Sequence, residues 1–114
     1  MGARTPAPPA ERLLRLLGLG FRARQVVIGV DQIRAGLRAN RFACIVVAAD
    51  ASPRARDKVV RLAAGRGVSI LAGPPAATIG SRLGRPAVMV VGVLDRALAR
   101  GLADAAPGGV QTEA

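Results

Sequence analysis

The segment 41–62 constrains the fold more than any other part of the chain. It begins with a short apolar run, residues 44–49, whose length and β-branched content are typical of a buried strand. The run stops at Asp50, after which Ser52 is suited to cap a helix and Pro53 to occupy its first turn. A buried strand that leads directly into a capped helix is typical of an α/β domain.

The helix predicted over residues 53–65 has one apolar side and one cationic side. Its apolar residues recur at helical spacing, so this side is expected to pack into a core. The helix predicted over residues 30–39 also carries cations along one side. The two cationic stripes consist of Arg34, Arg38, Arg41, Arg54, Lys58 and Arg61. Two such stripes with little intervening acid favour a polyanion as the partner.

The composition supports a nucleic-acid partner. The 114 residues include 17 Lys or Arg against 7 Asp or Glu, a formal net charge of +10, yet 51% are hydrophobic. A chain of this length and hydrophobic content is expected to form one folded domain with a modest core. All cations except Lys58 are Arg, whose planar head group binds phosphates and guanine edges in a bidentate manner.

Missing residue types exclude several functions. The chain has no His, and its single cysteine, Cys44, lies inside an apolar run. We therefore expect no metal, no cofactor and no disulfide, which fits a reducing cytoplasm. No apolar run reaches the ~18 residues of a membrane span, so no membrane partner is expected. Phe21 and Phe42 are the only aromatic residues, which argues against a single-strand reader and favours a structured RNA.

Helix and strand patterns alternate along the chain. This alternation predicts a central sheet with helices on both faces, a three-layer α-β-α sandwich. Flexible tails are expected at residues 1–8 and 104–114, on either side of a single domain over 9–103. The predicted helices cover residues 11–18, 30–39, 53–65, 76–83 and 95–102, and the predicted strands cover 25–28, 43–49, 68–72 and 87–93.

Evidence for catalysis is weak. Asp50 and Asp95 both follow predicted strands, but aspartates in such places more often cap helices than act as a pair. A Gly-x-Gly at Gly18 follows a helix rather than a strand, which makes it a poor phosphate loop. We expect no enzyme, and a small-molecule or nucleotide-binding domain that uses Asp50 and Asp95 remains an alternative.

Gly29 is placed to open a helix. The free N–H groups of a first helical turn bind phosphates or base edges. Arg22, Arg24, Gln32 and Arg34 are close to it in sequence. Taken alone, Gly29 is better explained as a plain strand-to-helix turn, and it is the two cationic stripes that favour binding.

Several segments, taken in order, resemble the ribosomal protein L7Ae/L30e superfamily, whose members bind kink-turn RNA. They are the first helix, the short strand before Gly29, the apolar strand ending in Ala-x-Asp, the basic helix, and the final segment IGSRLGRPAVMVVGVLD. In the final segment, Ile79-Gly80 stands where family members have a Leu-Gly pair. The resemblance covers about residues 11–102 and is strongest to small bacterial members that act alone as RNA-binding proteins. It implies a three-layer α-β-α fold with a small mixed sheet.

The resemblance also implies an RNA site at the start of the second helix. Family members there have Gly, a small residue, Asn or Lys, and Glu or Gln, with a Lys three residues later. The matching positions are Gly29, Val30, Asp31, Gln32 and Ala35. Gly29 and Gln32 fit the pattern, whereas Asp31 and Ala35 replace groups that meet guanine edges and phosphate.

The loop before the last strand is the second part of the implied site. Arg85, Pro86, Ala87 and Val88 match the apolar cap that family members place over the kink, and Arg85 adds a cation. Arg34 and Arg38 are candidates to replace the missing Lys.

The predicted function is non-enzymatic binding of a structured, kink-turn-like RNA, for example a ribosomal one, by a monomer. The alternatives are a protein-interaction module of the same fold, which would use the Arg stripes on an acidic partner, and the small-molecule domain named above. The predicted RNA-binding residues are Gly29, Val30, Asp31, Gln32, Arg34, Arg38, Arg54, Lys58, Arg85, Pro86, Ala87 and Val88.

Overall fold

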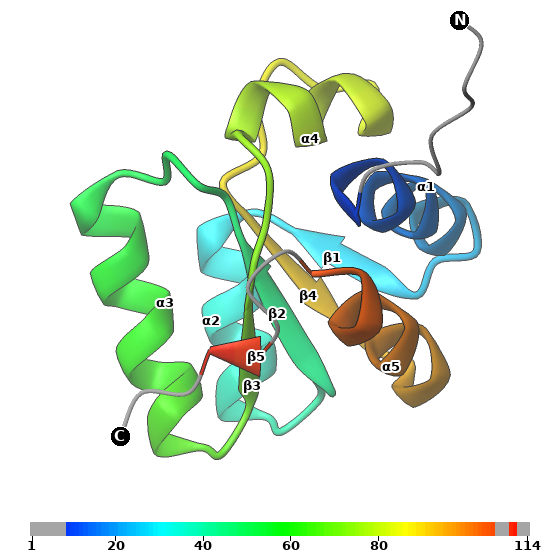
Figure 1. The fold of residues 1–114 in the computed structure, drawn as a ribbon. Coiled ribbons are helices and arrows are strands. Elements are labelled where there is room, and N and C mark those ends of the chain that lie inside the picture. Colours follow the sequence, from blue (N-terminus) through cyan, green and yellow to red (C-terminus); the bar gives the residue numbers. More distant parts are fainter. Residues whose placement is uncertain (1–8, 107–109, 112–114) are drawn as a thin grey trace, which may run out of the picture.

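The computed structural model describes residues 9–106 and 110–111, in which helices and strands alternate (Figure 1). The elements are α1 (Pro9–Arg22), β1 (Val26–Ile28), α2 (Val30–Arg38), β2 (Cys44–Val47), α3 (Pro53–Gly65), β3 (Ser69–Ala72), α4 (Ala76–Leu83), β4 (Val90–Val93), α5 (Arg96–Ala105) and β5 (Val110–Gln111).

The strands form one mixed sheet in the order β1-β4-β2-β3-β5. β2 and β3 are parallel, whereas β4 is antiparallel to both of its neighbours, β1 and β2. Gly92 of β4 therefore pairs with Val27 on one side and with Ile45 on the other. The three strands β1, β2 and β3 share one direction, and β4 begins at the edge where they end.

Helices cover both faces of the sheet (Figure 1). α2 and α3 pack together on one face, while α1 and α5 pack together on the other, with α4 against α1. The predicted three-layer α-β-α sandwich with a mixed sheet is confirmed. Every residue of β2 and β4 is buried, as expected for strands covered on both sides.

Phe42 fills the space between α2 and the sheet. A Cβ atom on Gly36 of α2 would lie 2.4 Å from the Phe42 ring, and one on Gly92 of β4 would lie 2.6 Å from it. Both glycines are thus needed for the ring to fit, and the ring is buried at 8% exposure. This packing fixes α2 against β4.

The predicted capping residues Ser52 and Asp95 and the predicted stop at Asn40 are confirmed. Ser52 Oγ accepts a hydrogen bond from the Ala55 N–H at 3.1 Å, and Pro53 occupies the first turn of α3. The Asp95 carboxylate accepts from the Leu98 N–H at 2.8 Å at the start of α5. Asn40 follows α2 with a φ of 57°, a left-handed conformation that stops a helix.

Several predicted boundaries are wrong. α1 continues through Gly18 and Gly20 to Arg22, and β4 starts at Val90 rather than at residue 87. Within the predicted flexible tail 104–114, α5 extends to Ala105 and residues 110–111 form β5. β5 forms because β3 offers a free edge, which a local sequence pattern does not reveal. The predicted tail 1–8 and residues 107–109 and 112–114 lie outside the described residues.

In the described part of the chain, no helix is both long enough and apolar enough to span a bilayer.

Cys44 is predicted to be unreactive in the folded protein. Its side chain is buried in β2, and burial raises the pKa of the thiol to about 12. Because the thiolate is the reactive form, iodoacetamide at about pH 8 should modify native Cys44 far more slowly than denatured Cys44. Mass spectrometry measures the modified fraction over time. A second cysteine introduced by Ser81→Cys on exposed α4 serves as the reactive control, and equal rates at both positions would contradict the buried placement.

Candidate nucleic-acid interface

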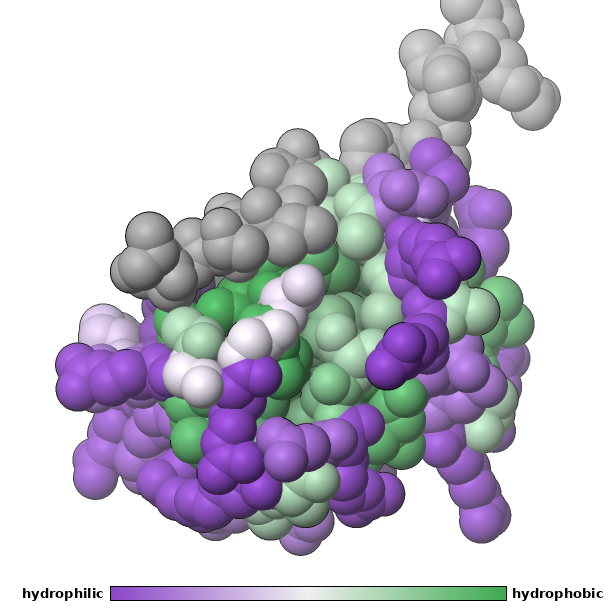
Figure 2. Space-filling model, turned by 90° about the horizontal axis from the view of Figure 1, so that it is seen from below, coloured by the Kyte–Doolittle hydropathy of each residue, from purple (hydrophilic) through white to green (hydrophobic). Residues whose placement is uncertain are grey.

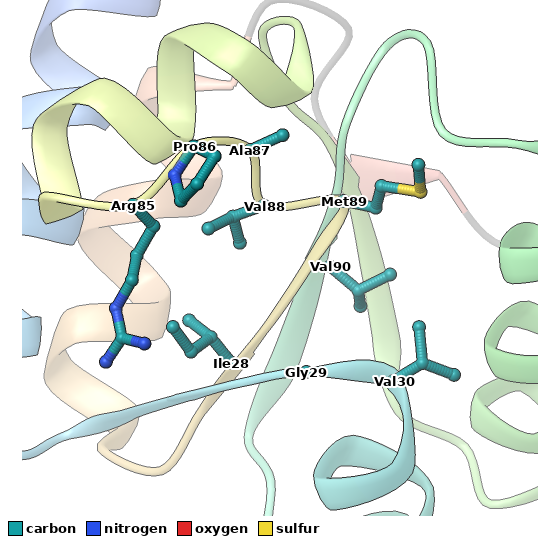
Figure 3. A pocket seen from close by; sticks show the side chains of 9 residues that line it. All are labelled: Ile28, Gly29, Val30, Arg85, Pro86, Ala87, Val88, Met89 and Val90. Carbon is teal, nitrogen blue, oxygen red and sulfur yellow. The ribbon is translucent and has the colours of Figure 1, made fainter.

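A groove of about 500 Å³ lies where the start of α2 meets the segment before β4 (Figure 3). The two parts are far apart in sequence and meet because β4 begins at the edge where β1 ends. The groove thus combines the two regions that the family resemblance implied. Its lining consists of Ile28, Gly29, Val30, Arg85, Pro86, Ala87, Val88, Met89 and Val90.

Gly29 leaves the start of α2 open. Its φ of 101° and ψ of 129° lie in a region that favours glycine. Glycine supplies no side-chain cap, so the first-turn N–H groups remain available to a ligand. Gln32 lies beside this opening, with its Cγ 3.8 Å from where a Cβ of Gly29 would be. Asp31 is exposed in the same turn, where a negative charge stabilises a helix.

The loop over residues 84–88 is held against α4 at two points. Gly84 ends α4 in a left-handed conformation, with a φ of 72°. The Arg85 N–H donates to the Gly80 carbonyl oxygen at 2.8 Å, and the Val88 N–H donates to the Ala76 carbonyl oxygen at 3.0 Å. These bonds hold the loop in place without a ligand.

Gly80 explains why the loop can approach α4 so closely. A Cβ atom at this position would lie 2.7 Å from the Arg85 carbonyl oxygen and 2.8 Å from the Ala87 backbone nitrogen. The neighbouring Ile79 is fully buried. The Ile79-Gly80 pair noted in the sequence therefore has a physical role, because it anchors α4 in the core and admits the loop backbone.

The loop residues differ in accessibility. Arg85, Pro86 and Ala87 are exposed, whereas Val88 is buried at 5% exposure. The Val88 side chain therefore packs in the hydrophobic core and supports the loop from its inner side. Met89, which sequence reasoning did not select, is 38% exposed and also lines the groove.

The exposed Arg85 also contacts α1. Its guanidinium carbon lies 5.8 Å from the centre of the Phe21 ring, within the range of a cation–π interaction. This contact keeps the positive charge at the rim of the groove. No local sequence signal links Phe21 to Arg85.

A second, basic groove of about 440 Å³ lies between α2 and α3. It brings together the predicted residues Arg34, Arg38 and Lys58 and adds Arg61, which forms an ion pair with Asp57 at 2.9 Å. Buried Arg34 Nε has no hydrogen-bond partner among the described residues. The predicted site residue Arg54 is exposed in the first turn of α3 but does not line this groove.

The carboxylates serve mainly to hold the fold. Asp50 accepts a hydrogen bond from the Ala76 N–H at 2.8 Å and so caps α4, as Asp95 caps α5. Asp50 follows β2 and Asp95 follows the antiparallel β4, so they lie at opposite ends of the sheet. They cannot form the single site considered from the sequence. In the part of the chain that the structure describes, no group of three His, Cys, Asp or Glu residues is arranged to hold a metal.

The end of the sheet where β2 and β3 begin has an apolar hollow. Figure 2, which views the molecule from that end, shows hydrophilic residues around an apolar hollow. A cavity of about 390 Å³ lies there between α5 and the first residues of β2 and β3. Arg96 and Arg100 of α5 line it.

The sequence matches the Ribosomal protein L7Ae/L30e/S12e/Gadd45 family over residues 11–102. The chain belongs to this family. The resemblance noted in the sequence is thereby confirmed at the level of the family.

Solved structures of low sequence identity share the fold. A protein with unknown function from Bacillus halodurans C has a TM-score of 0.78 at 24% identity, over 82% of this chain and 95% of that one. The Giardia lamblia 15.5kD RNA binding protein has a TM-score of 0.73 at 16% identity, over 89% of this chain and 87% of that one. A search of curated proteins gives no match.

Gly80→Ala should destabilise the protein because the added methyl group meets loop backbone. We expect a decrease of about 1–3 kcal/mol in the free energy of unfolding, typical of overpacking, measured by urea denaturation. Gly18→Ala is the control, since nothing lies within 4 Å of its Cβ position in α1. It should stabilise by roughly 0.5–1 kcal/mol. Equal effects of the two changes would show that the loop does not require glycine at position 80.

Proposed function

We propose that this chain is an RNA-binding protein that recognises a structured, kink-turn-like RNA. The observation that carries the proposal is the groove in which the open start of α2 faces the loop 84–88. Membership in the L7Ae/L30e/S12e/Gadd45 family supports it, and so does the fold shared with an RNA-binding protein from Giardia lamblia.

The groove has the features needed to receive an unstacked base. Ile28, Pro86, Ala87 and Met89 provide apolar surface for the face of a base. The first-turn N–H groups of α2 and the Gln32 amide provide hydrogen bonds for its edge. Because the loop is already held by α4, little ordering entropy is lost on binding.

The basic groove between α2 and α3 is suited to the RNA backbone. Arg38 and Lys58 are exposed and can bind phosphates, and Arg34 lines the same groove. We thus assign base recognition to the groove between Gly29 and the loop 84–88, and positioning of the RNA backbone to the groove between α2 and α3. Arg54, in the first turn of α3, is a separate candidate for a phosphate contact.

The direct test compares a kink-turn RNA with a straight duplex of the same base composition. The wild-type protein should bind the kink-turn more tightly at physiological salt, as measured by fluorescence anisotropy. Crosslinking in cells, followed by sequencing of the bound RNA, should enrich folded RNAs that contain kinked internal loops. Equal affinity for both synthetic RNAs would contradict kink recognition, and failure to bind either would contradict the proposal as a whole.

Gln32→Ala should weaken kink-turn binding by about 1–3 kcal/mol, the range for removal of a base contact. It should leave binding to the straight duplex nearly unchanged. Gln25→Ala provides a matched control, because Gln25 precedes β1 at the other end of the strand. Equal effects of Gln32→Ala on both RNAs would show that Gln32 does not read a base.

The double change Asp31→Asn and Ala35→Lys should strengthen kink-turn binding. It removes an exposed anion beside the groove and restores a cation, and each restored interaction should contribute on the order of 1 kcal/mol. The control pair Asp104→Asn and Ala97→Lys makes the same change in net charge on exposed positions of α5. An equal increase in affinity from both pairs would indicate general charge attraction rather than interactions at α2.

A further inference from the structure

A third groove, of about 480 Å³, lies between α1 and α4 on the side of the molecule away from α2 and α3. None of the residues selected from the sequence for RNA binding belongs to it. Its lining consists of Leu14, Arg15, Gly18, Phe21, Arg22, Arg82 and Leu83.

The groove is positively charged. Arg15 and Arg22 are exposed on one face of α1, two helical turns and about 10 Å apart. Neither forms an ion pair among the described residues. Arg82 also lines the groove and forms an ion pair with Glu11 at 2.5 Å, which fixes α4 against α1. Arg15 attracts Glu11 without a direct ion pair, so the head groups of Arg15 and Arg22 are both available to bind an anion.

Gly18 lines the groove without a side chain and so leaves space between Arg15 and Arg22. A Cβ atom at this position would have no neighbour within 4 Å, whereas one on Gly20 would lie 2.5 Å from Leu98 Cδ2. Packing thus explains Gly20 but not Gly18. A glycine inside a helix lowers its stability relative to alanine, so Gly18 has a cost without a structural benefit. Its position between two arginines fits close approach of a bulky ligand backbone.

The third groove is continuous with the proposed RNA site. Arg85 lines the first groove and Phe21 lines the third, and the two side chains are in contact. An RNA held at the start of α2 would meet the α1–α4 groove as it extends past Arg85.

We propose that a double-stranded stem adjoining the kink lies along the α1–α4 groove, with Arg15 and Arg22 binding its phosphates and Gly18 leaving room for its backbone. The inference rests on the proposed function and extends it. It predicts that the protein contacts a stem next to the kink as well as the kink itself.

The test uses two kink-turn RNAs, one with short stems and one with both stems lengthened by a helical turn. Wild type should bind the long RNA about tenfold more tightly. Arg15→Gln with Arg22→Gln should remove this advantage and reduce the salt slope for the long RNA by about 0.9 for each phosphate that the variant no longer neutralises. Binding to the short RNA should not change. Arg96→Gln with Arg100→Gln removes the same charge at the opposite end of the sheet and should preserve the advantage.

Gly18→Gln separates binding from folding. It should raise the melting temperature, because glutamine favours a helix, and also weaken binding to the long RNA by about tenfold by filling the groove. Gly65→Gln, at the exposed end of α3 with no neighbour near its Cβ position, should leave binding unchanged. Tight binding of the long RNA by Gly18→Gln would overturn the inference.

The outcomes distinguish the two proposals. If wild type binds neither RNA, the proposed function fails and the inference fails with it. If wild type prefers the kink-turn to a straight duplex but binds no more tightly when the stems are longer, only the inference is overturned. The same holds if the Arg15 and Arg22 changes act no differently from the α5 control, as expected if the groove binds an acidic protein instead.

Discussion

The insertion of β4 between β1 and β2, antiparallel to both, is the constraint on which the rest of the structure depends. Both edges of β4 are hydrogen-bonded, and Gly92 at its centre leaves room for the Phe42 ring that packs α2 onto the sheet. Because β4 runs against its neighbours, the chain must reach it at the edge where β1 turns into α2. The groove between Gly29 and the loop 84–88 follows directly from this strand order.

The charges divide into a structural set and a free set. Asp50 and Asp95 cap helices, Glu11 fixes α4 on α1, and Asp57 pairs with Arg61 within α3. Most of the arginines have no such partner among the described residues. Folding thus uses four of the described acidic residues and leaves most of the cations exposed, where they can attract a polyanion.

Three glycines show three different physical uses of a missing side chain. Gly29 adopts a positive φ and leaves a helix start uncapped. Gly80 allows the backbone of the loop 84–88 to pack directly on α4. Gly18 has no packing neighbour and keeps a cationic groove open. The first two shape the proposed base-binding groove, and the third extends the surface beyond it.

The sequence by itself determined the elements whose signals are local. Ser52, Pro53 and the apolar spacing of α3 act within a few residues, and the ordered segments indicated the family and its α-β-α layers. The resemblance also selected the two segments that line the groove. Tertiary structure decided what depends on contacts between distant residues. It buried Val88 while exposing Met89, separated Asp50 from Asp95 through the direction of β4, and paired β5 with the free edge of β3. Such contacts form only when the chain closes on itself, so no short stretch of sequence encodes them.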